Sequence, residues 1–351
     1  FNIFKEGLNK NMVRSIPRVR KKFKEGYTYL NRNTIIDKHP NYILKNLLKK
    51  FKCEDLHQYP DMFTSYNTLS EYLDVEKDKL LLTRGVEGSI KTVFESLNLK
   101  STDKVGTFDP TFAMFKVYAD VFNVELVSIK AKAPDYNITV DLVKEIVPNI
   151  KVLFLTNPMA HLENNFTNSE LEQIITYCEE KNVIVFLDEV YIGWESKSYL
   201  PFLDKHNNLI ISSSFSKSGF PSIKTGWLAC NKILKLQLEA TRGSYELDYF
   251  SCKTLEFIIE NKDYFNQLKN NLLEIKNKWI LKFKLNSDLT VFNSTLYTIR
   301  LYSNNKNLIK KIYKNLFKDK IVVNIIDDKN LQFAVTSNKE VESKFFKHVC
   351  R

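Results

Sequence analysis

The sequence predicts an α/β protein with two parts: a large domain built on a mixed, mainly parallel sheet flanked by helices, and a small α+β domain. Three observations lead to this expectation. Short β-rich runs alternate with stretches of helical periodicity from about residue 76 to residue 255. Several of these runs, such as VLFL and VIVFL, are apolar at every position, which is typical of strands covered on both faces. After about residue 255 a long helical stretch rich in Lys, Asn and Leu precedes further β-rich runs.

Seven strands are expected in the large domain. They are Lys79–Thr83, Lys104–Phe108, Glu125–Ile129, Lys151–Thr156, Val183–Asp188, Leu209–Ser213 and Gly226–Cys230. Amphipathic segments lie between them, and one of these, Ser169–Glu180, follows the helix-capping residue Asn168. Alternation of strands and helices at this spacing indicates a layered domain with a mainly parallel sheet.

The small domain is expected to begin with a long helix that ends near Lys284 and to close with a final helix. Its β-rich runs are Thr290–Tyr302, Ile321–Ile326 and Leu331–Thr336. We therefore divide the chain into an N-terminal arm that also contributes to the small domain (1–42), a large domain (43–255) and a small C-terminal domain (256–351). No internal repeat or low-complexity linker is visible.

The net charge of +11 raises the question of a nucleic-acid partner. Lysine supplies nearly all of the positive charge and is spread along the chain, so we expect no nucleic-acid binding. The one local concentration, Arg14–Lys24, is interpreted as a solvated basic arm, and contact with an anionic surface is the alternative.

Cysteine usage and hydropathy bear on the compartment. The five cysteines have no CxxC spacing, which argues against a disulfide framework or a zinc site and for a reducing environment. No apolar run reaches the length of a membrane span and no signal-peptide pattern opens the chain, so we expect a cytoplasmic protein without membrane association. The chain begins with Phe1 and not with Met, which leaves open whether a further segment precedes it.

A lysine directly follows one of the buried strands. The sequence SSSFSK ends at Lys217 and places the hydroxyls of Ser214 and Ser216 beside it. A lysine at the end of an apolar strand is poorly explained as a solvated surface charge. A carboxylate, Asp188, ends another apolar strand, and α/β sheets bind their ligands at such strand ends.

These two residue types match the needs of pyridoxal phosphate (PLP). A lysine forms a Schiff base with this cofactor, and a carboxylate pairs with the pyridine nitrogen so that the ring acts as an electron sink. Asp188 fits the second role, with a helix cap as the alternative. Tyr191 could donate a hydrogen bond to the phenolic oxygen of the ring.

Together these residues resemble the fold-type I PLP enzymes of the class I/II aminotransferase family, and within it the histidinol-phosphate aminotransferase group. The resemblance covers roughly residues 40–350. HQYP, which contains Tyr59, followed by LSEYL at Leu69–Leu73, is similar to the R-Y-P…L-x-x-Y-L segment of that group. It implies a homodimer in which Tyr59 reaches the cofactor phosphate of the neighbouring subunit.

Two further segments carry the resemblance. Leu81–Ser89 is similar to the glycine-containing turn that opens a helix beneath the cofactor phosphate, where free N–H groups and the helix dipole favour an anion. Val86 and Glu87 would offer backbone donors there. Asp109–Phe112 is similar to the segment whose aromatic residue stacks on the pyridine ring, which implies this role for Phe112.

The chain also departs from the family pattern. The N-P-N-N-P-T-G motif is replaced by NPMAHLE, in which Asn157 matches the first asparagine. That position is usually structural in the family, and Asn157 is also counted among the cofactor contacts. The asparagine that touches the ring oxygen falls on Ala160, and His161 could donate in its place or serve only in packing. The arginine that grips the cofactor phosphate is replaced by Lys224, which neutralises phosphate as a point charge without a bidentate fork.

The positions that bind substrate anions in the family are also changed. Gln332 stands where the family has an arginine that clamps the substrate α-carboxylate, and Asn324 stands where the resembled group has an arginine that helps hold substrate phosphate. Neither side chain forms a charge-assisted pair with an anion. Arg242 or Arg32 could replace one of these arginines, and a surface arginine is the alternative for each.

We therefore expect a PLP-dependent aminotransferase that acts through a Lys217 Schiff base on an amino donor and a small keto or amino compound, with phosphorylated compounds among the candidates. Lys217 would also carry the proton once substrate releases it. Two alternatives stay open. One is a PLP-dependent decarboxylase of a phosphorylated amino acid, and the other is a non-catalytic binding module with the PLP fold. Retention of Asp188, Tyr191 and Tyr59 together with Lys217 argues against the second.

Overall fold

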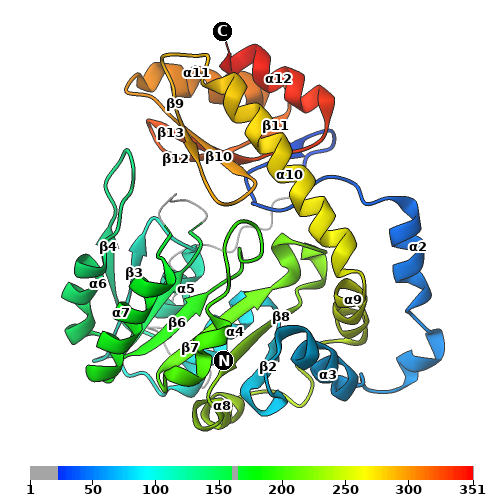
Figure 1. Cartoon of the computed structure of the whole chain (residues 1–351), viewed down its shortest axis with the longest axis vertical. Coiled ribbons are helices and arrows are strands. Elements are labelled where there is room, and N and C mark those ends of the chain that lie inside the picture. Colours follow the sequence, from blue (N-terminus) through cyan, green and yellow to red (C-terminus); the bar gives the residue numbers. More distant parts are fainter. Residues whose placement is uncertain (1–22, 160–164, 351) are drawn as a thin grey trace, which may run out of the picture.

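The computed structural model describes residues 23–159 and 165–350, and its centre is a seven-stranded sheet (Figure 1). The strand order is β2-β8-β7-β6-β5-β3-β4. The strands are β2 Leu80–Thr83, β3 Lys104–Asp109, β4 Glu125–Lys130, β5 Val152–Thr156, β6 Ile184–Asp188, β7 Leu209–Ser214 and β8 Gly226–Cys230. The pairs from β4 to β7 are parallel, and β8 runs antiparallel to both β7 and β2. The predicted α/β fold with a mixed, mainly parallel sheet is confirmed.

Helices cover both faces of this sheet. One face carries α4 Gly85–Ser96, α5 Ala113–Val121 and α8 Lys232–Glu239, and the other carries α3 Met62–Leu73, α6 Val140–Ile146, α7 Asn168–Glu180 and α9 Tyr249–Glu260. Alternate residues of a strand serve opposite faces, as the pleat requires. In β5, Phe154 packs in the cluster with α4, α5 and α8, whereas Leu153 and Leu155 pack in the cluster on the other face. This double burial explains why central strands such as β5 and β6 are apolar at all but their last position.

A smaller antiparallel sheet of order β12-β13-β10-β9 lies above the large one in Figure 1. Its strands are β9 Thr290–Asn293, β10 Thr298–Tyr302, β12 Asn324–Asp327 and β13 Asn330–Ala334, and its helices are α10 Lys262–Phe283, α11 Lys306–Lys318 and α12 Lys339–Val349. Near the N-terminus, β1 Thr28–Tyr29 pairs in parallel with β11 Ile321–Val322. The described part of the N-terminal arm therefore lies beside the small sheet, before α2 Asn41–Lys49 begins.

The hydrophobic cores of the two parts meet within α10. Helix α9 continues unbroken across residue 255, where the sequence suggested a boundary, and ends at Glu260. Phe265 of α10 still packs with the core of the large sheet, whereas Leu272 and Trp279 pack with that of the small sheet. None of the helices in the described ranges is long and apolar enough to cross a membrane.

Short 3-10 helices make several of the connections. They are Cys53–His57, Lys77–Lys79, Val147–Asn149, Leu200–Lys205, Phe215–Lys217 and Pro221–Ile223.

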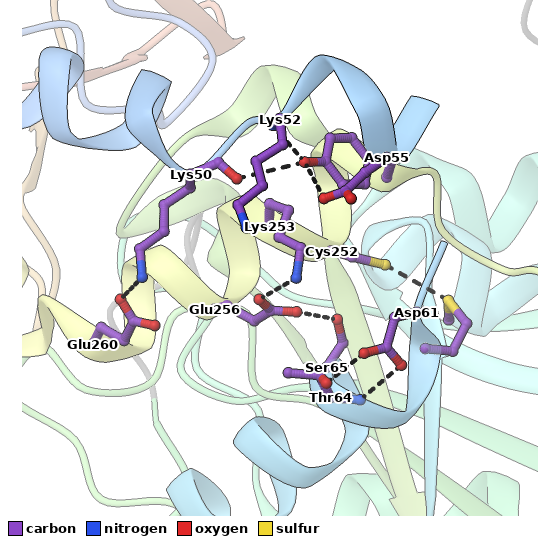
Figure 2. Close-up of polar contacts among 12 residues, drawn as sticks. Lys50, Lys52, Asp55, Asp61, Thr64, Ser65, Cys252, Lys253, Glu256 and Glu260 are labelled. Carbon is purple, nitrogen blue, oxygen red and sulfur yellow. Dashed lines mark hydrogen bonds and ion pairs between the residues drawn. The ribbon is translucent and has the colours of Figure 1, made fainter. Parts of the chain in front are cut away.

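Polar contacts hold the segment before α3 against α9 (Figure 2). Ser65 of α3 donates to the buried carboxylate of Glu256 over 2.9 Å, and Lys253 pairs with the same carboxylate. Asp61 caps α3 by accepting from the backbone N–H of Thr64. The loop that contains Tyr59 is therefore fixed at the end where α3 begins.

Candidate active site

A pocket of about 220 Å³ lies at the edge of the large sheet where strands β2, β3, β5, β6 and β7 end. This is the edge at which open α/β sheets bind ligands. Residues from each of these strand ends line it: Gly85, Val86, Glu87, Pro110, Thr111, Phe112, Thr156, Met159, Asp188, Val190, Tyr191, Ser214, Ser216, Lys217 and Lys224. Nine of these residues had been predicted from the sequence as cofactor contacts.

Lys217 lies in the 3-10 turn that follows β7, with Ser214 as its N-cap. Its Nζ donates to the backbone carbonyl of Arg32 over 3.0 Å and lies 5.7 Å from the ring centroid of Tyr191. Burial lowers the pKa of Lys217 to about 8, although the charge of Asp188 opposes the shift. At neutral pH this amine is uncharged far more often than an ordinary lysine, as a nucleophile must be.

Asp188 ends β6 and is 2% exposed. Burial raises the pKa of its carboxyl to about 7, against the effects of a hydrogen bond from the Val190 N–H and of the charge on Lys217. A buried carboxylate in this state gains most from a cationic hydrogen-bond donor. A protonated pyridine nitrogen is such a donor, so this residue fits the cofactor that the sequence suggested.

The N-terminus of α4 forms another wall. Gly85 has a φ of 67°, in the left-handed region that favours glycine, and it contacts Gly226 so closely that a Cβ at Gly226 would lie 2.6 Å from the Cα of Gly85. The unpaired N–H groups of Val86 and Glu87 begin the helix here, which is the arrangement that binds phosphate. The site therefore fits the phosphate of the cofactor as well.

A carboxylate side chain stands beside this anion site. Glu87 pairs with Lys224 over 3.2 Å, so the lysine expected to hold phosphate already has an anionic partner. Beneath the turn, a chain of hydroxyls links Thr83, Ser89 and Ser212 at 2.9 and 2.8 Å. These bonds tie the first turn of α4 to β2 and β7.

Phe112 is the N-cap residue of α5 and lines the pocket with its ring partly exposed. Thr156 and Met159, at the end of β5, were not predicted as site residues. Thr156 has a hydroxyl that is buried without a hydrogen-bond partner. A polar residue at a strand end is the signal that could have identified it.

Two of the predicted cofactor contacts, Asn157 and Tyr59, do not line the pocket. Both ends of the Asn157 amide bond the backbone of Phe166, so this side chain closes a loop and does not line the pocket. Tyr59 is 77% exposed and stacks on Tyr245 with ring centroids 4.5 Å apart. His161, together with Ala160, lies outside the described residues.

The two arginines proposed as anion clamps do not point their guanidinium groups into the pocket. Arg242 forms an ion pair with Glu246 and lines a neighbouring depression. The guanidinium of Arg32 lies 4.3 Å from the ring centroid of Phe23, and only its backbone carbonyl reaches Lys217.

The small sheet contains a buried arginine that the sequence reasoning missed. Arg300 of β10 pairs in register with Gln332 of β13, which in turn pairs with Asn324 of β12. The Arg300 guanidinium lies between the rings of Tyr136 and Phe292, at 5.0 and 3.7 Å, and donates to Asn330 over 2.6 Å. An arginine within the apolar strand TIRLY was the signal in the sequence.

Comparison with known proteins gives a consistent assignment. A histidinol-phosphate aminotransferase of Buchnera aphidicola subsp. Cinara cedri is 28% identical over 266 residues, covering 73% of this chain and 71% of that protein. A histidinol-phosphate aminotransferase of Clostridium kluyveri is 24% identical over 335 residues, covering 92% and 89%.

Solved structures show the same fold. The histidinol-phosphate aminotransferase from Clostridium acetobutylicum has a TM-score of 0.80 at 18% identity, with 92% of this chain and 98% of that one covered. The L-threonine-O-3-phosphate decarboxylase from Porphyromonas gingivalis has a TM-score of 0.75 at 14% identity, with 91% and 97% covered. The family model of aminotransferase class I and II matches residues 15–328, almost the whole chain. The chain therefore belongs to the class I and II aminotransferases, which are PLP-dependent enzymes.

Proposed function

We propose that this aminotransferase holds its cofactor on Lys217 and moves an amino group between an amino donor and a small phosphorylated compound of the histidinol phosphate type. The observation that carries the proposal is the presence of Lys217 and Asp188, both largely buried, in the lining of one pocket. Burial brings the pKa of each toward neutrality, to about 8 and about 7, which is the electrostatic signature of catalytic groups.

Eight residues that line the pocket would hold the cofactor together with Lys217. Asp188 would pair with the pyridine nitrogen, Tyr191 would donate to the phenolic oxygen and Phe112 would cover one face of the ring. The N–H groups of Val86 and Glu87, the hydroxyls of Ser214 and Ser216, and the charge of Lys224 would hold the phosphate. PLP itself supplies the electron sink for the carbanion at the substrate Cα.

Lys217 also serves as the base. As a free amine Lys217 has a pKa of about 8, because burial lowers it, so it could accept and return a proton near neutral pH. The backbone of Lys217 is fixed in the turn after β7, which keeps its amine within the pocket.

The phosphorylated substrate is supported by the relatives and not by a contact in this chain. The relatives from Buchnera and Clostridium kluyveri are named for histidinol phosphate. An amino alcohol phosphate has no carboxylate, so it makes no demand on the position where Gln332 stands. Its phosphate would lack the arginine that Asn324 replaces, so other groups would have to bind it.

We further propose a cytoplasmic homodimer in which Tyr59 contributes to the neighbouring site. Tyr59 is 77% exposed and stacks on Tyr245, which is itself 46% exposed, and Phe63, four residues along, is 68% exposed. Exposed aromatic side chains gathered in this way are typical of an interaction surface. Asp61, whose bond to Thr64 is drawn in Figure 2, fixes the start of α3 between Tyr59 and Phe63 in the chain. The five unpaired cysteines fit a reducing compartment.

Decarboxylation of a phosphorylated amino acid is the second candidate. It is favoured by Gln332, because a carboxylate without a fixed arginine is free to lie perpendicular to the ring, where its bond to Cα breaks. A decarboxylase of this kind shares the fold.

A matched set of substrates separates these candidates. Histidinol phosphate added to the loaded protein is expected to convert the visible absorbance to that of the amine form, and 2-oxoglutarate is expected to restore it. Histidinol, which lacks only the phosphate, is the control and should react far more slowly. Equal reaction of both would contradict the phosphorylated substrate class. Carbon dioxide released from L-threonine O-3-phosphate, with no response to histidinol phosphate, would establish the decarboxylase instead.

A further inference from the structure

Consecutive residues of the N-terminal segment contact the two reactive side chains of the pocket. The carbonyl of Arg32 accepts from Lys217 Nζ over 3.0 Å. The side-chain Nδ2 of the next residue, Asn33, donates to the hydroxyl of Tyr191 over 3.3 Å. These residues are about 160 to 185 positions distant from their partners in the chain, so only the fold brings them together.

The backbone holds Asn33 in place. Its φ is 49°, in the left-handed region that asparagine tolerates better than most residues. The side chain is almost fully buried, with 4% of the residue exposed. Just before it, Leu30 forms backbone hydrogen bonds to Val322 and Ala334 of the small domain, at 2.8 and 3.0 Å.

The contact determines where the Tyr191 proton points. Burial raises the pKa of Tyr191 well above its usual value, so the hydroxyl keeps its single proton. Because the Asn33 amide donates to the Tyr191 oxygen, the hydroxyl proton is not used in this contact. It can therefore be donated to an acceptor in the pocket. An amide that accepted from Tyr191 instead would take this proton away from the cofactor.

We propose that Asn33 is a positioning residue that directs the Tyr191 hydroxyl toward the phenolic oxygen of the cofactor and so sets the proton affinity of the Lys217 Schiff base. The proposal rests on the proposed function of Lys217. A hydrogen bond to the phenolic oxygen stabilises negative charge there, and that charge grows when the Schiff base loses its proton. Donation by Tyr191 therefore lowers the proton affinity of the Schiff base, and loss of this donation raises it.

The substitution Asn33→Asp tests this directly, because aspartate has nearly the same shape but can only accept. It is expected to draw the Tyr191 proton to itself. The measurement is the pH at which the visible band of the PLP-loaded protein changes colour, which needs no turnover. In Asn33→Asp this transition should move upward, with proton affinity raised by about tenfold or more. Tyr191→Phe, which has no hydroxyl to donate, should move the transition in the same direction.

A double-mutant cycle separates positioning from the added charge. If Asn33 acts through Tyr191, most of the shift caused by Asn33→Asp should vanish in the Tyr191→Phe background. Asn31→Asp, on the same segment, adds the same charge and is the control. It should shift the pH of the colour transition less than Asn33→Asp does, and by the same amount with Tyr191 and with Tyr191→Phe. Thermal unfolding of each variant reports on folding separately.

Three results would overturn the inference. The transition could stay in place in Asn33→Asp, which would mean that the amide already accepts from Tyr191. The shift could be equally large with and without the Tyr191 hydroxyl, which would assign it to charge alone. A wild-type protein without a visible band would remove the proposed function together with this inference, whereas either of the first two results leaves the role of Lys217 intact.

Discussion

Two adjacent carboxyl groups at the end of β6 have nearly the same pKa for the same reason. Burial raises the pKa of both Asp188 and Glu189 to about 7. Their hydrogen bonds distinguish them, because Glu189 is held by the hydroxyl of Ser198 and the N–H of Tyr199. Asp188 faces the pocket with one backbone donor shown, from Val190. A raised pKa therefore marks a functional site only where the carboxylate also meets a cavity.

The raised pKa of Asp188 predicts a pH-dependent cost to stability in the cofactor-free protein. The folded state holds the proton up to about pH 7 and the unfolded state loses it near pH 4, so stability falls as pH rises through this window. Asp188→Asn removes this cost. We expect the variant to be more stable than wild type by roughly 2–4 kcal/mol at pH 8.5 and nearly equal at about pH 4, as urea denaturation would measure. Equal differences at both pH values would contradict the assignment.

The Glu87–Lys224 pair predicts that the cofactor phosphate competes with a resident carboxylate. Glu87→Gln removes that charge, so it should free Lys224 to bind the phosphate and relieve the repulsion between the phosphate and the carboxylate. The backbone N–H groups of the turn remain in the variant. We expect the dissociation constant for PLP to fall by about fivefold in absorbance titrations of the cofactor-free protein. Glu95→Gln, which breaks a pair with Lys91 farther along α4, is the matched control and should change it less than twofold. Weaker binding in Glu87→Gln would instead give the carboxylate a supporting role.

At the scale of elements, the close approach of β8 to the start of α4 shapes the phosphate site. A Cβ at Gly226 would lie 2.6 Å from the Cα of Gly85 and 2.9 Å from the carbonyl oxygen of Ser213, both of which are backbone atoms. The strand and the helix can be this close only because two glycines face each other.

Gly226→Ala is therefore expected to displace the first turn of α4 from β8. We predict at least about tenfold weaker PLP binding together with a lower melting temperature, because overpacking against backbone costs about 1–3 kcal/mol. Gly243→Ala is the control, since no atom lies within 4 Å of its added Cβ and its φ is not positive. An unchanged affinity in Gly226→Ala would mean that the turn has room to move.

The central strands β5 and β6 were predictable because burial on both faces leaves a continuous apolar run, VLFL in one and IVFL in the other. The sequence pattern does not mark the boundary between the two parts, because α9 and α10 have the same helical periodicity on both sides of it. Phe265 packs with the core of the large sheet and Leu272 with the core of the small sheet, and only tertiary packing determines this difference. The run Thr290–Tyr302 is two strands, β9 and β10, with Ser294 between them accepting from the N–H of Leu296.

At the scale of the molecule, an exposed aromatic surface around Tyr59 and Phe63 supports a dimer. Phe63→Glu would place a charge in that interface, so we expect it to convert a dimer into a monomer in sedimentation experiments and to weaken PLP binding through loss of the partner's Tyr59. Ile233→Glu, at an 83% exposed position of α8, makes the same kind of change on another surface and should remain dimeric. A monomeric wild type that binds PLP tightly would contradict the proposed role of Tyr59.

The site was predictable where residues stand at the ends of apolar strands in one sheet, and not where tertiary contacts alone join distant segments. Asp188 ends one apolar strand and Lys217 follows another, so strand ends brought them to one edge of the sheet. Asn33 contacts a partner far along the chain, and no spacing in the sequence links it to Tyr191. Asn157 matches a motif position that is usually structural, and its amide bonds the backbone of Phe166.

The attachment of the cofactor is the centre of this account, and one measurement tests it most directly. The PLP-loaded protein is reduced with borohydride, which makes the link to lysine permanent, and its peptides are mapped by mass spectrometry. We predict that the modified lysine is Lys217, which lines the pocket together with Asp188. We also predict that Lys217→Ala loses both the visible band and the modified peptide. Modification of another lysine, or a visible band that survives in Lys217→Ala, would contradict the assignment.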